Sequence, residues 1–183
     1  MKGFYIFCDE SLKKGKYYSN FYGRVLIDKS EFEKVKNAIT SKVQDLQIEN
    51  SELKWGNVNT YKLQQYKEVV DVFFEFVKAN VVKVRIMFTD NRFIAKNLTK
   101  EHHENQYHIL YYHFLKLAFG LKYIVSDVPI DLEIFFDKLP DSDKKNHQFK
   151  NYIYGIQFLP EFSGLSINIK KDSIYEVDSR ADA

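Results

Sequence analysis

Three acidic residues stand where side chains could do metal chemistry. Asp9 follows the apolar run 4–8, Glu52 lies in the stretch SELKW, and Asp137 follows the apolar run LEIFF. In open α/β sheets, functional sites gather at the carboxyl ends of strands. Asp9 and Asp137 would therefore lie side by side if their strands are neighbours.

Clustered carboxylates repel one another unless a cation lies between them. Mg²⁺ and Mn²⁺ prefer oxygen ligands, and Mg²⁺ is often held by only one or two carboxylates together with substrate phosphate. Two such ions, about 3.5–4 Å apart, clamp the attacking and leaving oxygens of phosphoryl transfer. The pattern predicts a metal-dependent phosphodiesterase in which activated water, and no protein nucleophile, attacks the phosphodiester.

An ordinary structural reading of the same acids stays open. Asp and Glu are common at strand ends because they suit turns and solvent. Residues 130–137 alternate apolar and acidic side chains, which also fits a half-exposed strand without a function. Cys8, the one cysteine, lies in an apolar run and is expected to be a small buried residue.

Three residues near the acids are candidates for contacting nucleic acid. Trp55 could stack on a base or cap the edge of the core, Lys54 could touch phosphate, and Lys138 directly follows Asp137. The histidine-rich stretch EHHENQYH does not match a zinc-protease helix, because its histidines are five residues apart instead of four. Glu104 and His108 share a helix face there and could pair.

Composition bounds the class of protein. The chain has 183 residues, 45% hydrophobic and 28% charged, with a formal net charge of +2. This predicts a single globular domain, residues 1–183, with a real core. The single cysteine fits a cytoplasmic location, and no apolar run is long enough for a membrane span. With seven glycines and no glycine-rich phosphate loop, ATP, GTP or dinucleotide use is not expected.

Hydrophobic periodicity predicts alternating strands and helices. We expect strands at 4–8, 17–28, 81–90, 128–140 and 165–179, and helices at 30–47, 60–79, 99–121 and 142–158. This order favours an α/β fold with helices on both faces of a sheet of about five strands. Since the first two strands form a hairpin around Gly15, the sheet should be mixed.

The order of several short stretches resembles one known family. An apolar strand runs into DES, and FYGRVLI, ELKW, FFDKLP and YEVDSR follow in sequence. Together they resemble the DUF3800 family of bacterial and phage proteins over almost the whole chain, although each stretch alone is common. The resemblance implies a ribonuclease-H-like fold and a nuclease that uses Mg²⁺ or Mn²⁺ on RNA or DNA, in settings such as phage defence or a mobile element.

The resemblance also implies roles for individual residues. Asp9, Glu52 and Asp137 would be the catalytic, metal-binding acids, and Asp178 in VDS a further metal ligand. In the family the segment after VDSR usually continues into a helix with another acid. Here the sequence ends at RADA, so either Asp182 takes that place or the helix is lacking.

That departure supports an alternative from a different class. The chain would then be a weak or inactive binding or regulatory module that needs a partner protein, or that assembles with copies of itself. Divalent-ion binding discriminates the two hypotheses, because a degraded site should not respond to Mg²⁺ or Mn²⁺.

Overall fold

The fold is built on one mixed five-stranded sheet. The structure, a computed structural model, describes residues 2–48, 53–93, 95–162 and 164–177. The strands are β1 (Lys2–Lys14), β2 (Tyr18–Asp28), β3 (Val82–Asp90), β4 (Ile130–Asp137) and β5 (Ile167–Val177). Their spatial order is β3-β2-β1-β4-β5. Only β2 runs against the other four, because β1–β2 and β2–β3 pair antiparallel while β1–β4 and β4–β5 pair parallel.

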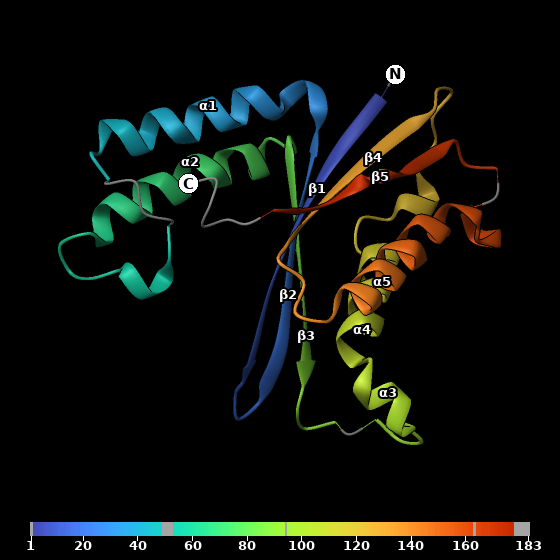
Figure 1. Ribbon diagram of the computed structural model, residues 1–183. Coiled ribbons are helices and arrows are strands. Elements are labelled where there is room, and N and C mark those ends of the chain that lie inside the picture. The colour runs from blue at the N-terminus through green and yellow to red at the C-terminus, as the bar shows by residue number, and fades with distance from the viewer. Residues whose placement is uncertain (1, 49–52, 94, 163, 178–183) are drawn as a thin grey trace.

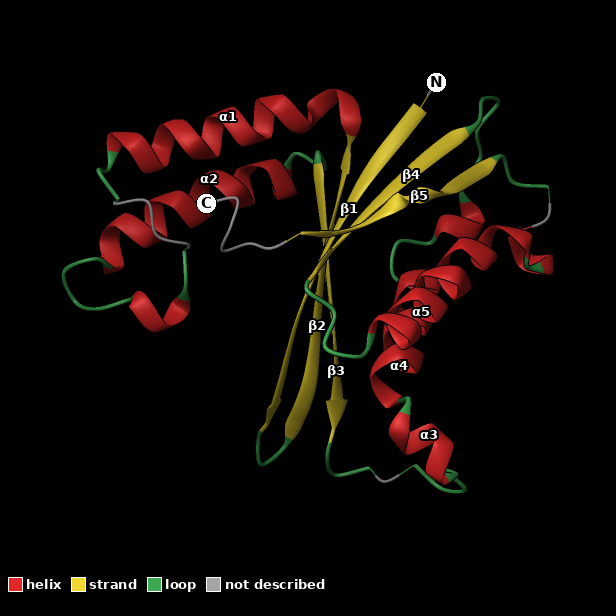
Figure 2. Cartoon of the chain, in the orientation of Figure 1, coloured by secondary structure: helices red, strands yellow, loops and turns green. Residues whose placement is uncertain are grey.

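Helices cover both faces of this sheet (Figures 1 and 2). One face carries α1 (Lys29–Asp45) and α2 (Leu63–Lys78), and the other carries α3 (Lys100–Glu104), α4 (Gln106–Leu117) and α5 (Asp143–Gly155). The predicted α/β class and mixed sheet are confirmed, and the strand order and directions are those of a ribonuclease-H-like fold. No helix among the described residues is long and apolar enough to cross a membrane.

The larger core lies between the sheet and the α4–α5 layer. Alternate residues of β4 point into it, and Leu132, Ile134 and Phe136 are almost completely buried. Tyr111 and Phe149 meet them from α4 and α5. A smaller core under α1 and α2 is built around Ile27, Val35 and Val82.

Two elements differ from their predicted extents. The first strand does not end at Asp9: it continues to Lys14, with Glu10 opposite Tyr22 on β2. The predicted hairpin turn is present, closed by the Gly15 amide donating to the Tyr18 carbonyl at 3.0 Å. The predicted helix 99–121 is interrupted at Asn105, whose backbone leaves helical geometry at φ −108°, ψ 12°.

Candidate functional site

Asp9 and Asp137 come together where two parallel strands separate. β1 and β4 stay in register up to Cys8 opposite Phe136, so Asp9 and Asp137 are the next residues along each strand. Both line one pocket of about 300 Å³. There β4 ends while β1 continues beside β2. The parting of the strands therefore creates a pocket with a carboxylate from each.

A row of aromatic rings lies under these acids. Phe7 stacks on Phe135 at 5.0 Å between centroids, and Phe135 stacks on Tyr175 of β5 at 4.9 Å. Each residue lies two positions before the residue that its strand contributes to the pocket: Asp9, Asp137 or Val177. Such ring pairs add about 0.5–1.5 kcal/mol beyond the area they bury. The row thus holds three strands in register directly below the pocket.

Each aspartate is oriented by its own backbone. The Glu10 amide donates to Asp9 Oδ1 at 2.8 Å, and the Lys138 amide donates to Asp137 Oδ1 at 2.8 Å. Asp9 is exposed and Asp137 is half-buried. The same short bond at both positions holds each carboxylate at the mouth of the pocket, in reach of solvent.

Glu10 is a third carboxylate, which sequence reasoning did not select as a site residue. It points toward α4, where the Tyr107 and Tyr111 hydroxyls donate to its two oxygens at 3.1 and 3.2 Å. Burial raises the pKa of Glu10, and the negative charges of Asp9 and Asp137 raise it further, against the two tyrosine hydrogen bonds. Alternation along β1 was the available signal, because Ile6, Cys8 and Glu10 share one face of the strand.

Cys8 and Arg24 lie behind Glu10 in the core. Burial raises the pKa of the Cys8 thiol to about 12, so the side chain is no nucleophile at neutral pH, as its apolar context predicted. Arg24 is 1% exposed, donates from Nη2 to the Tyr111 carbonyl at 2.6 Å, and stacks on the Tyr111 and Phe114 rings. The guanidinium thereby ties β2 to α4 behind the pocket.

The other predicted site residues divide into two groups. Glu52, Asp178 and Asp182 lie outside the described residues, so their roles stay predictions. Lys138 is exposed immediately after Asp137, Lys54 is exposed before the short helical turn Trp55–Asn57, and the Trp55 side chain is not described.

The described part of the chain contains no group of three side chains that could hold a metal ion. It does contain the chemistry of a smaller set, two carboxylates opening into one pocket. One or two carboxylates, completed by water and substrate phosphate, are a common protein contribution to Mg²⁺ binding. Asp9 and Asp137 therefore fit a hard divalent cation.

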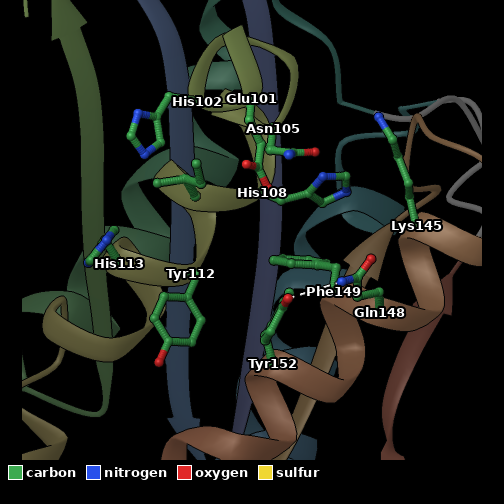
Figure 3. A pocket seen from close by; sticks show the side chains of 11 residues that line it. Glu101, His102, Asn105, His108, Tyr112, His113, Lys145, Gln148, Phe149 and Tyr152 are labelled. Carbon is green, nitrogen blue, oxygen red and sulfur yellow. Dashed lines mark hydrogen bonds between the residues drawn. The ribbon is translucent and has the colours of Figure 1, made fainter. Parts of the chain in front are cut away.

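A second pocket, of about 570 Å³, separates α3 and α4 from α5 (Figure 3). It includes His102, His108 and His113 but no metal-ligand cluster. The possible pair of Glu104 and His108 is wrong: Glu104 lies near Lys100, and His108 faces Asp141 at 3.9 Å. The break at Asn105 separates the two residues into different helices.

Comparisons with known proteins give similarity to solved structures alone. No family model matches the chain, and no curated protein does. The crystal structure of Bst RNase HIII in complex with Mn²⁺ aligns with a TM-score of 0.44 and 12% identity, covering 98% of this chain and 46% of that one. A mutant of the same protein aligns at 0.43 and 14%, covering 96% and 45%. The chain thus spans less than half of each, and the DUF3800 resemblance stays a prediction.

Proposed function

We propose that this chain is a divalent-metal-dependent nuclease that hydrolyses phosphodiester bonds of RNA or DNA. The observation that carries the proposal is the convergence of Asp9 and Asp137 on one pocket at the point where β1 and β4 separate. Two fixed carboxylates on a rigid sheet suit an ion that must be held in one geometry. When bound, Mg²⁺ or Mn²⁺ would supply activation of water and neutralisation of phosphate charge.

The chain's own residues would position that chemistry. Asp9 and Asp137 present carboxylate oxygens whose orientation is fixed by the amides of Glu10 and Lys138. Glu10 adds negative potential from the opposite face of β1, and its two tyrosine partners anchor the strand there. The stacked rings of Phe7 and Phe135 keep the two acid-bearing strands together.

Further residues complete the proposal as predictions. Glu52, Asp178 and Asp182 would add ligands, and Lys54, Trp55 and Lys138 would contact the nucleic acid. Phage defence or a mobile element is the biological setting that the family resemblance suggests. The alternative, a binding module that needs a partner protein, predicts the same fold without metal-dependent cleavage.

The proposal is tested by nuclease assays on labelled RNA and DNA with Mg²⁺, Mn²⁺ or EDTA. Asp9→Asn and Asp137→Asn each keep the oxygen that accepts the backbone amide and remove only the charge. Because a catalytic metal contributes several kcal/mol to the transition state, each change should reduce cleavage by at least about a hundredfold.

Asp131→Asn is the matched control. Asp131 lies on the same strand and face as Asp137, at the far end of β4, and its Oδ1 accepts from Asn168 at 2.6 Å. This variant should keep wild-type activity. Full cleavage by Asp9→Asn, or cleavage undiminished by EDTA, would contradict the proposal.

A further inference from the structure

The sheet face that carries Asp9 continues past α1 and α2 as an exposed aromatic surface. Figure 1 shows β2 and β3 running beyond the ends of these two helices. On this stretch lie Tyr18, Phe21, Ile86 and Phe88, which we call the open sheet face. Their exposed fractions are 39%, 37%, 65% and 48%. No helix or strand among the described residues covers them.

These side chains form one cluster. Phe88 lies 4.9 Å from Tyr18 and 5.7 Å from Phe21 between ring centroids. The backbone is prepared for this, because Asn20 adopts a positive φ of 52° at an irregularity in the β2–β3 pairing. The Asn20 amide also donates to the Thr89 hydroxyl at 3.1 Å, which fixes the irregular segment against β3. The rings are therefore held as a platform and do not depend on a buried core.

The open sheet face is continuous with the acid pocket. Asp9 lies opposite Gly23 on β2, and Gly23 lies opposite Ile86 on β3. A Cβ at Gly23 would meet only the Asp9 carbonyl oxygen, at 3.8 Å, so nothing on this strand rises between the acid and the apolar surface. Phe21 follows two residues along β2 from Gly23, about 7 Å away.

The surroundings of the platform are basic. From Ser11 to Ile27 the sequence contains basic residues and no Asp or Glu, and residues 83–96 contain four basic residues and one acid. That acid, Asp90, is already paired with Arg92 at 2.6 Å. Cations also lie over rings, with Lys16 at 5.1 Å from the Tyr17 ring and Arg92 at 5.7 Å from the Tyr18 ring. A chain with a net charge of only +2 thus gathers positive charge beside its exposed rings.

We propose that the open sheet face is a stacking platform for single-stranded nucleic acid, which leads the strand from the β1–β2 hairpin to Asp9 and Asp137. Exposed rings beside basic side chains are how proteins bind single strands without reading sequence, since every base has a face that can stack. Paired bases keep their faces inside the duplex, so a double strand cannot use the platform. The inference rests on the proposed nuclease function and names the class of its substrate.

The test measures binding separately from cleavage. Fluorescence anisotropy is recorded in EDTA with labelled 15-nucleotide oligothymidylate and oligouridylate, and with a duplex of the same length. The wild-type protein should bind the single strands more tightly than the duplex, and binding should weaken as salt rises. Phe88→Ala should weaken single-strand binding at least about fivefold, given the measured worth of one base–aromatic stack.

Tyr123→Ala is the matched control. Tyr123 is 73% exposed and has Lys122 over its ring at 4.8 Å, but it lies in a short helical turn outside the sheet. Its removal should leave binding unchanged. Should Phe88→Ala lower stability, a Lys14→Gln/Lys16→Gln double variant tests the same surface, and it should weaken binding and reduce its salt dependence.

The outcomes separate the two proposals. Binding that depends on Phe88 in a protein that cleaves nothing would support the platform and contradict the nuclease. Cleavage that depends on Asp9, together with single-strand binding that Phe88→Ala leaves intact, would overturn the platform alone. Absence of single-strand binding, equal binding of the duplex, or a dimer that Phe88→Ala dissociates would also overturn it, the last by showing a second copy of the chain on this surface.

Discussion

The two faces of β1 differ at adjacent residues. On the α4–α5 face, Glu10 follows the buried Ile6 and Cys8 and is held by two tyrosine hydroxyls. On the other face, Asp9 is exposed beside a pocket and the open sheet face. A strand one residue thick thus separates a closed, hydrogen-bonded carboxylate from an accessible one.

This difference teaches where stability and chemistry reside. The closed face contains most of the fully buried side chains, and its aromatic contacts link the sheet to both α4 and α5. The open face has a smaller core under α1 and α2 and then exposed rings. We therefore expect substitutions on the closed face to change the free energy of unfolding, and those on the open face to change binding.

The largest expected effect comes from truncating the same ring on each face. Phe136→Ala removes a side chain that is 1% exposed and packs on Tyr111 and Phe149, and should cost about 3–5 kcal/mol of unfolding free energy. Phe88→Ala removes a ring that is half exposed and should cost less than about 1 kcal/mol. Urea unfolding of both variants measures the difference.

Equal losses from the two truncations would contradict this division of roles. A large loss for Phe88→Ala in particular would mean that the open sheet face is part of a core, and its rings would no longer be available to a ligand.

A smaller effect should appear in the pH dependence of stability through Glu10. Its pKa is raised in the folded protein, so the proton is bound more tightly there than in the unfolded chain. The stabilisation from the protonated group is complete below the ordinary carboxyl pKa and is lost as pH rises through the folded value. Glu10→Gln should therefore match the wild type near pH 4 and be more stable at pH 7.

The matched readout is the difference in unfolding free energy between Glu10→Gln and wild type, followed from pH 4 to 7.5, since other titrating groups cancel in it. A difference that does not change with pH, or a variant less stable than wild type at pH 7, would show that the tyrosine hydrogen bonds outweigh burial.

Much of the fold could be predicted because the periodic segments are long and consistent. The alternation of β4 and the helical spacing of residues 30–47 identified those elements nearly to their ends. The break at Asn105 could not be seen, because the apolar pattern continues across it. The extension of β1 was missed because polar residues after Asp9 resemble a turn, whereas pairing with β2 keeps them in the strand.

For the site, sequence supplied residue types but not adjacency. Asp9 and Asp137 are 128 positions apart, and only the parallel pairing of β1 with β4 brings them to one pocket. Glu10 was passed over because its neighbours from α4, Tyr107 and Tyr111, are equally distant in sequence. Glu52, Asp178 and Asp182 stay predictions that the described residues do not test.

The most direct measurement is thermal unfolding in EDTA, Mg²⁺ and Mn²⁺ for the wild type, Asp9→Asn, Asp137→Asn and the control Asp131→Asn. A ligand that binds only the folded state adds about 2.7 kcal/mol at a hundredfold excess over its dissociation constant. We predict a metal-dependent rise in Tm for wild type and Asp131→Asn that is lost in Asp9→Asn and Asp137→Asn. An unresponsive wild type, or an undiminished response in Asp9→Asn, would contradict a metal site at the parting of β1 and β4.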